Sequence, residues 1–297
     1  MDCLGGWPRS RRGRALKEVT NFLRFIRFSH TVFALPFALA AMLVAANGLP
    51  TGRVFGGILA AMVFARTAAM TFNRIVDWEI DQRNPRTAGR HRLVDRRTAI
   101  ILCAICAVGF VLSAWWLNDL CFLLSPVALG AIFFYSLTKR FTHFAQIFLG
   151  LSLAIAPVGA WIAVTGTFAA PPLILAAAVL LWVTGFDLIY ATQDYEVDRR
   201  EGLKSLVVWL GISRSFRLAV ILHGLAFLGL ALFGVFASLG LTYFFSLAVV
   251  LAALVYEHFE ARRGTVESIN QAFFVANAAV GLAFLLGVFL DRIGPIA

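Results

Sequence analysis

Charged residues are scarce in this chain, and acidic residues are scarcer than basic ones. Charged residues make up 14% of the 297 residues, while 60% are hydrophobic and the mean hydropathy is +0.83. A water-soluble domain of this length needs far more polar surface, so a soluble globular fold is excluded. The composition instead predicts an all-α fold, a polytopic bundle of membrane-spanning helices.

Cysteine is equally sparse and has no spacing typical of a metal site. Cys103 and Cys106 form a Cys-x-x-Cys pair inside an apolar run, without a second pair elsewhere. We therefore interpret them as small packing residues and not as a redox or zinc site. Histidines with ligand-like spacing are also lacking, which argues against metal or haem ligation by His30, His91, His143, His223 and His258.

No linker long or polar enough to separate domains interrupts the chain. Residues 1–30 form a basic lead-in, expected at the cytosolic surface, and 31–297 form a single transmembrane domain. Apolar runs of suitable length predict about nine membrane spans. These lie near 31–48, 54–73, 98–116, 121–137, 145–164, 172–190, 215–237, 242–258 and 271–290.

The net charge of +10 does not indicate nucleic-acid binding, because the basic residues recur between apolar runs and not on one surface. They follow every second span. The positive-inside rule places these basic connections and the N-terminus in the cytosol, and an odd number of spans places the C-terminus outside. We expect a multi-pass protein of the cell, or inner, membrane.

The first acidic motif closes the second predicted span. At 100° per residue, Asn73, Asp77 and Asp81 fall with Arg66 within an arc of roughly 80° on one helix. Ionisable groups at membrane depth cost a few kcal/mol when they face lipid, so they are expected to face a cavity.

A second acidic motif closes the sixth predicted span. Asp187, Asp194 and Asp198 fall within about 40° of one another, with Tyr190 at their edge. Residues 77–81 and 194–198 share the order Asp, aromatic, Glu, aliphatic, Asp, which indicates an internal repeat.

Four carboxylates on one side of the membrane repel each other unless cations intervene. Mg²⁺ suits them, because it takes carboxylate oxygens and completes its shell with water and substrate phosphates. Basic residues that could bind the phosphates are Arg66, Arg86, Lys139, Arg140 and Lys204. Acidic and basic clusters together are typical of a site that ionises a diphosphate, and aromatic rings such as Tyr190 could stabilise the resulting carbocation.

These motifs resemble the UbiA-type intramembrane aromatic prenyltransferases. Asn-x-x-x-Asp-x-x-x-Asp is matched by Asn73, Asp77 and Asp81, and Tyr-x-x-x-Asp-x-x-x-Asp by Tyr190, Asp194 and Asp198. Further matches are Arg66, Arg86-Thr87, Tyr135 with Lys139-Arg140, and Gly202-Leu203-Lys204-Ser205. The resemblance spans nearly all nine expected helices and is strongest to 4-hydroxybenzoate polyprenyltransferases and their menaquinone-pathway relatives.

The resemblance implies Mg²⁺-dependent transfer of a polyprenyl group from its diphosphate to an aromatic acceptor in quinone biosynthesis. It implies metal binding by Asn73, Asp77, Asp81, Asp194 and Asp198, diphosphate binding by Arg66, Asn73, Arg86, Lys139, Arg140 and Lys204, and a substrate pocket with Tyr135, Tyr190 and His30. Three roles stay open for Asp187: orienting the acceptor hydroxyl, acting as a base, or pairing with Arg66.

Two other classes of protein share parts of this pattern. A cation-coupled transporter also carries intramembrane acids and repeats, but its acids lie near the midplane and beside broken helices. A membrane phosphotransferase would need an Asp-Gly…Ala-Arg segment before its Asp-x-x-x-Asp, and the sequence lacks one. A prenyltransferase acting on a menaquinone-pathway or other lipid precursor stays open as well.

Overall fold

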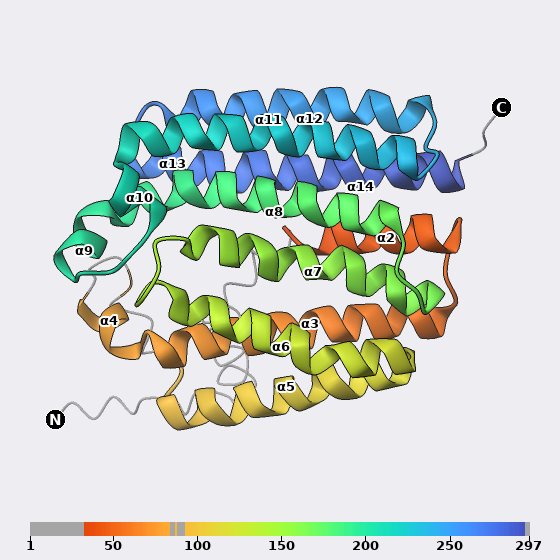
Figure 1. The fold of residues 1–297 in the computed structure, drawn as a ribbon, viewed down its shortest axis with the longest axis horizontal. Helices are drawn as coiled ribbons and strands as arrows, with labels where there is room; N and C mark the ends of the chain where they lie inside the picture. The colour runs from red at the N-terminus through yellow and green to blue at the C-terminus, as the bar shows by residue number, and fades with distance from the viewer. Residues whose placement is uncertain (1–32, 84–86, 88–92, 295–297) are drawn as a thin grey trace, which may run out of the picture.

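The computed structural model describes residues 33–83, 87 and 93–294, and in these ranges the regular structure is helical throughout. The long helices lie side by side and reverse direction at each connection (Figure 1). Among the described residues, eight segments are long and apolar enough to cross a membrane. They are α3 (Gly52–Val76), α5 (Arg96–Leu117), α6 (Asp119–Thr138), α7 (Ala145–Thr165), α8 (Ala170–Ala191) with its continuation to Arg200, α11 (Ile212–Phe236), α12 (Leu241–Ala261), and Val266–Ile293, which ends in α14 (Asn277–Ile293).

The predicted polytopic helical bundle is confirmed. The first expected span, near 31–48, corresponds to α2 (Leu35–Ala46), which is apolar but shorter than the other eight. Its predicted start at residue 31 lies outside the described residues. Short helices α4 (Trp78–Arg83), α9 (Tyr195–Arg200), α10 (Leu206–Leu210) and α13 (Val266–Gln271) gather at the end of the bundle where α3 and α8 finish (Figure 1).

Polar side chains fix where several helices begin. The Asp95 carboxylate accepts a hydrogen bond from the Thr98 amide at 3.0 Å, and the Asn118 side chain accepts one from the Cys121 amide at 2.8 Å. Each bond satisfies an amide that has no partner within the first helical turn. Asn118 alone separates α5 from α6, so its cap allows a sharp reversal between two membrane spans.

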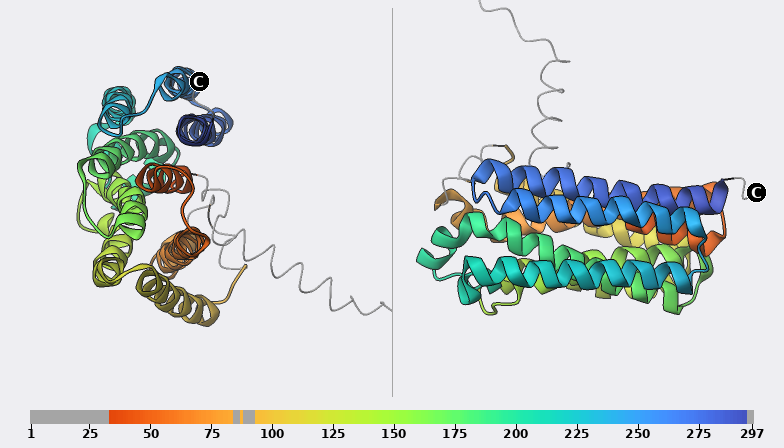
Figure 2. Two further views of the ribbon diagram at one scale, coloured as in Figure 1. Left: turned by 90° about the vertical axis from the view of Figure 1, so that its right-hand side faces the viewer. Right: turned by 90° about the horizontal axis from the view of Figure 1, so that it is seen from above.

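Viewed along its long axis, the bundle is curved (Figure 2, left). The blue C-terminal helices, the green middle helices and the yellow α5 follow one another around the curve, while α2 and α3 lie on its inner side. α2 packs against α7, α8 and α14, and α3 packs against α5, α6 and α7. The short helix α2 therefore connects the two halves of the bundle.

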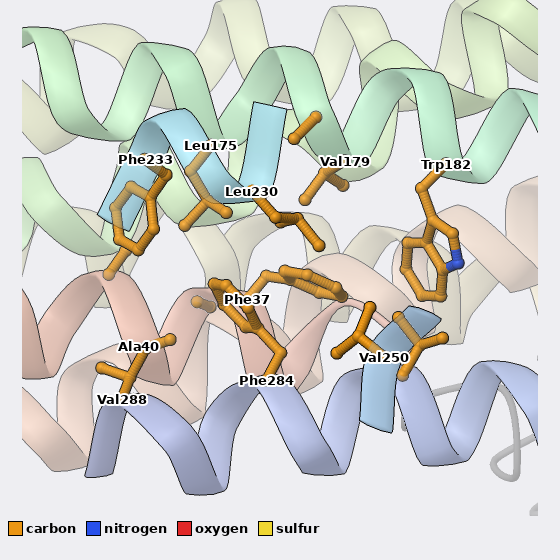
Figure 3. Packing of buried hydrophobic residues seen from close by; sticks show 14 of the residues in the cluster. Phe37, Ala40, Leu175, Val179, Trp182, Leu230, Phe233, Val250, Phe284 and Val288 are labelled. Carbon is orange, nitrogen blue, oxygen red and sulfur yellow. The ribbon is translucent and has the colours of Figure 1, made fainter. Parts of the chain in front are cut away.

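Aromatic side chains take part in the contacts of α2 with the C-terminal half (Figure 3). Phe37 is 1% exposed, and its ring lies 4.9 Å from that of Trp182 and 4.8 Å from that of Phe284. In a bilayer these contacts stabilise the fold through close packing, because lipid tails are as apolar as the side chains.

Large apolar side chains also cover the outside of the helices. Phe245 is 73% exposed, and many leucines and phenylalanines on α5, α6, α11 and α12 are exposed in the same way. A soluble monomer does not expose apolar surface on this scale. The outer surface is therefore the one that contacts lipid.

Each acidic motif departs from a straight helix, which the sequence analysis did not anticipate. α3 ends at Val76, and Asp77 (φ −89°, ψ 13°) separates it from α4. α8 ends at Ala191, and a 3₁₀ turn at Thr192–Asp194 precedes α9. The expectation of one continuous helical face is therefore wrong at both motifs, because side chains beyond each break follow the direction of a new, short helix.

Replacement of Phe37 by alanine tests the packing of α2. We expect Phe37→Ala to lower the free energy of unfolding by about 3 kcal/mol, because it leaves a cavity between Trp182 and Phe284. The exposed Phe245→Ala is the matched control and should change it by less than about 0.5 kcal/mol. Thermal unfolding in detergent measures both, and equal effects would contradict the central place of α2.

Candidate active site

A cavity of about 220 Å³ lies at the end of the bundle where the two acidic motifs meet. α3 and α4 contribute one acidic motif, and α8, the 3₁₀ turn and α9 contribute the other. The connection from α6 to α7 brings in basic residues. The two ends of the internal repeat thus share one space, although they are more than a hundred residues apart in sequence.

Most of the residues that the sequence analysis singled out line this cavity. They are Arg66, Asn73, Asp77, Asp81, Tyr135, Lys139, Arg140, Asp187, Tyr190, Asp194 and Asp198. The structure brings them together, while their roles stay predictions. Glu79 and Glu196, the middle acids of the two motifs, are exposed instead.

Three predicted residues are not placed in this cavity. Lys204 is exposed, its backbone amide donates to the Lys139 carbonyl at 2.8 Å, and its ammonium group donates to the Phe141 carbonyl at 3.4 Å. These contacts join the loop before α10 to the connection after α6. Arg86 and His30 lie outside the described residues.

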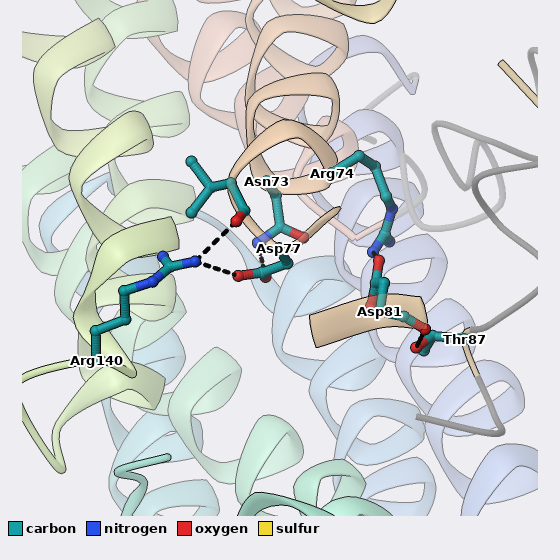
Figure 4. A network of polar contacts seen from close by, with 7 residues as sticks. Asn73, Arg74, Asp77, Asp81, Thr87 and Arg140 are labelled. Carbon is teal, nitrogen blue, oxygen red and sulfur yellow. Dashed lines mark hydrogen bonds and ion pairs between the residues drawn. The ribbon is translucent and has the colours of Figure 1, made fainter. Parts of the chain in front are cut away.

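Asp77 is held from two sides (Figure 4). The Asn73 side-chain amide donates to its carboxylate at 3.2 Å, and Arg140 lies 3.3 Å from the other carboxylate oxygen. Arg140 also donates to the Val76 carbonyl at 2.8 Å, at the end of α3. Burial raises the pKa of Asp77, against the opposing effect of Lys139 and Arg140.

Arg74 forms a buried ion pair with an acid of the first motif. Its guanidinium lies 3.0 Å from the Asp81 carboxylate, and the two side chains are 6% and 15% exposed. The Thr87 hydroxyl donates to the Asp81 carbonyl at 2.9 Å, which ties residue 87 to α4. The sequence analysis missed Arg74, because next to Asn73 it resembles a topology charge; its spacing of seven residues from Asp81 was the available signal.

Lys139 approaches the second motif. Its ammonium nitrogen lies 3.7 Å from the Asp198 carboxylate, which is itself buried. Burial works to lower the pKa of Lys139, but nearby carboxylates outweigh it and raise the pKa to about 12. Those carboxylates belong, in order of effect, to Asp198, Asp187, Asp194 and Asp77. Lys139 therefore stays positively charged at neutral pH.

One wall of the cavity is aromatic and consists of Phe33, Phe186, Tyr190 and Phe273, which we call the aromatic wall. The Phe273 ring lies 5.0 Å from Phe33, 5.3 Å from Phe186 and 4.2 Å from Tyr190. Apart from Tyr190, the sequence analysis did not identify these residues, because phenylalanines are abundant on every helix.

A second, apolar cavity of about 470 Å³ adjoins the charged one. The two share Arg66, Tyr135, Leu149 and Leu153 as lining residues. The apolar cavity lies mainly between α3, α5, α6 and α7 and reaches Phe168 before α8. A ligand with a charged head and a long apolar tail could place its head in the charged cavity and its tail in the apolar one.

The donor set of the charged cavity fits a hard divalent cation. Carboxylates from both motifs and the Asn73 amide line it, and such oxygen donors are those that Mg²⁺ prefers. Within the described residues, however, no three His, Cys, Asp or Glu side chains lie close enough to hold a metal ion by themselves. A bound ion would need further ligands, such as the oxygens of a substrate.

Fold and site together define a multi-pass membrane protein with a charged cavity next to an apolar one. Comparison with known proteins gives the family: the chain matches the UbiA prenyltransferase family over residues 34–285. The chain belongs to this family and is a prenyltransferase.

Relatives and solved structures agree with this assignment. The chain is 31% identical to the 4-hydroxybenzoate octaprenyltransferase of Vibrio atlanticus (strain LGP32), over 92% of this chain and 97% of the relative. A UbiA homologue from Aeropyrum pernix K1 is 30% identical and superposes with a TM-score of 0.80, covering 89% of this chain and 98% of that one. A homologue from Archaeoglobus fulgidus bound to GPP and Mg²⁺ shares the fold, with a TM-score of 0.70 at 18% identity and coverage of 91% and 99%.

Loss of the Arg74 guanidinium should destabilise the site. We expect Arg74→Met to lower the free energy of unfolding by about 3 kcal/mol, because breaking a buried ion pair leaves a charge in a poorly solvated place. Arg83, which pairs with Glu201 at 3.3 Å but is 66% exposed, provides the control. Arg83→Met should cost less than about 1 kcal/mol. Thermal unfolding measures both, and equal losses would contradict the prediction.

Proposed function

We propose that this prenyltransferase transfers a polyprenyl group from polyprenyl diphosphate to a 4-hydroxybenzoate-like aromatic acid in quinone biosynthesis. The observation that carries the proposal is the junction of the charged and apolar cavities at Arg66 and Tyr135. A prenyl diphosphate has the matching shape and polarity. Its diphosphate would lie among the acidic motifs, and its tail would enter the apolar cavity.

The basic residues of the cavity would bind the diphosphate oxygens. Lys139 and Arg140 are in contact with Asp198 and Asp77, so these cations are already partly withdrawn from water and can exchange a carboxylate partner for an arriving phosphate. Arg66 would contact the phosphate nearest the tail, because it lines both cavities. Mg²⁺, held by Asn73, Asp77, Asp81, Asp194 and Asp198, would supply the positive charge that stabilises the leaving diphosphate.

The reaction then requires walls that do not react with a carbocation. The bond between the allylic carbon and the diphosphate oxygen breaks, and the electron-rich acceptor ring forms a carbon–carbon bond with the cation. The faces of the aromatic wall stabilise positive charge, and their apolar surroundings exclude water. The ring proton would leave to Asp187, to the released diphosphate or to water.

Names of the relatives favour 4-hydroxybenzoate as the acceptor. A precursor of the menaquinone pathway is the alternative, because the sequence resembles that branch as well. We place the protein in the cell, or inner, membrane, and the charge distribution favours an orientation in which the site faces the cytosol. Basic residues gather at the site end, including Lys139, Arg140, Arg199, Arg200, Lys204, Arg262 and Arg263.

An acceptor assay tests the proposed substrate. Purified protein in lipid vesicles should transfer a labelled prenyl group from its diphosphate to 4-hydroxybenzoate, and more slowly to a menaquinone-pathway acid. Chelation with EDTA should abolish transfer and excess Mg²⁺ should restore it, since repulsion between the carboxylates and diphosphate is then relieved. Transfer to other aromatic acids but not to 4-hydroxybenzoate would overturn the acceptor, and full activity with EDTA would overturn the metal.

The exposed glutamates provide matched controls for the cavity carboxylates. Asp77→Ala and Asp194→Ala should lower kcat by about a hundredfold or more, because each removes a proposed metal ligand. Glu79→Ala and Glu196→Ala remove acids of the same motifs that are exposed, and should leave kcat within about twofold. Prenyl transfer by membranes with equal amounts of each variant measures this. Full activity of either aspartate variant would defeat the metal assignment.

A further inference from the structure

A chain of buried polar groups runs through the C-terminal half of the bundle. His223 on α11 has one ring nitrogen 3.2 Å from the Trp182 carbonyl on α8 and the other 3.0 Å from the His258 ring on α12. Glu257 lies 3.6 Å from His223 and accepts a hydrogen bond from Asn277 on α14 at 3.1 Å. Polar groups of four helices thus lie next to one another at a depth where such groups are costly.

The surrounding helices pack closely around these polar groups. Glu257 and Asn277 are fully buried, and His223 is 2% exposed. Gly185 on α8 faces His223, and a Cβ atom at this position would clash with the imidazole. Any larger residue at position 185 would displace the ring. The proposed function uses none of these residues, so their burial needs another explanation.

This chain of polar groups ends at Asn277, next to an irregular segment of helix. Residues Ala272–Ala276 form a π-helical turn between α13 and α14. The backbone amide of Asn277 donates to the Phe274 carbonyl, while its side-chain amide donates to the Phe273 carbonyl at 2.9 Å. In a regular α-helix the Phe273 carbonyl would accept a hydrogen bond from the backbone amide four residues later, that of Asn277. Here the side-chain amide of Asn277 takes the place of that backbone donor. π-turns are rare and are found at functional sites.

The π-turn presents an aromatic ring to the charged cavity. Phe273, its second residue, is the member of the aromatic wall that contacts the other three. An extra residue in a helix rotates the preceding residues by about 100°, so without the π-turn Phe273 would point elsewhere. The other end of the polar chain is close to the same wall, because the Trp182 ring lies 5.0 Å from that of Phe186.

We propose that Asn277 and Glu257 are positioning residues for prenyl transfer, which fix the π-helical turn and thereby hold Phe273 in the aromatic wall. Asn277 acts directly on the Phe273 carbonyl, and Glu257 orients the Asn277 amide. His223 connects Glu257 to the helix that carries Phe186. The inference rests on the proposed function, because it assumes that the charged cavity is where the prenyl group is transferred.

A double-mutant cycle tests this role. Asn277→Leu keeps the side-chain size but removes both hydrogen bonds, and we expect it to lower kcat about tenfold, with a smaller change in KM for the diphosphate. Phe273→Leu should lower kcat by a similar factor. The double variant should fall no further than Phe273→Leu alone, because Asn277 acts through that ring. Effects that multiply in the double variant would overturn the proposal.

Two further variants separate positioning from stability. Glu257→Gln retains an oxygen that can accept from Asn277 and should stay within about threefold of wild-type kcat, whereas Glu257→Leu should match Asn277→Leu. Tyr243→Phe removes a comparable buried hydrogen bond, 2.6 Å to the Leu230 carbonyl, and should lower the thermal midpoint while leaving kcat unchanged. If Asn277→Leu and Glu257→Leu behave like Tyr243→Phe, the positioning role is wrong. If Asn277→Leu does not fold, the comparison of Glu257→Gln with Glu257→Leu tests the positioning role in its place.

Wild-type protein in the same assay distinguishes this inference from the proposed function. Transfer by wild type together with unaltered kcat in Asn277→Leu defeats the positioning role alone. If wild type transfers nothing to 4-hydroxybenzoate, the acceptor is wrong, and kcat is compared with an aromatic acid that the wild type does prenylate. Asn277→Leu and Phe273→Leu should then lower kcat by the same factor, and an unaltered kcat in Asn277→Leu would overturn the inference.

Discussion

Attraction between opposite charges at the edge of the membrane is the interaction on which this structure depends. Three acids of the two motifs lie beside basic side chains: Asp77 beside Arg140, Asp81 beside Arg74, and Asp198 beside Lys139. Without these cations, carboxylates from two motifs could not share one small cavity, because their repulsion adds to the cost of burial. The pairs also join elements distant in sequence, since Arg140 and Lys139 come from the connection between α6 and α7.

In the function we propose, the same pairs prepare the site for an anionic substrate. A diphosphate that binds to Lys139 and Arg140 exchanges one partner of these cations for another, so the two basic side chains need little further desolvation when it binds. The carboxylates released in this exchange become available to Mg²⁺ in the function we propose. Sequence analysis assigned the acids to metal and the bases to phosphate; contacts between the two sets are the part of the arrangement that it did not foresee.

Periodicity and composition predicted the helices and most of the cavity, because both depend on local sequence. The register of Asn73, Asp77 and Asp81, and its repetition at Asp194 and Asp198, predicted which side chains would meet. The breaks at Asp77 and at Thr192 were not predictable, because neither proline nor glycine marks them. Phe33, Phe186 and Phe273 were missed for another reason: only tertiary packing distinguishes a phenylalanine in a cavity wall from one that faces lipid.

The buried polar chain was beyond the reach of sequence patterns too, since His223 and His258 are 35 residues apart and share no ligand-like spacing. Helices in lipid gain little from the hydrophobic effect when they associate, so side-chain hydrogen bonds and close packing determine how they are oriented. Such bonds fix rotation about a helix axis better than interchangeable apolar contacts do. In the role we propose for them, Glu257 and Asn277 hold one aromatic ring in the cavity wall, and they do so from positions that neither lipid nor water reaches.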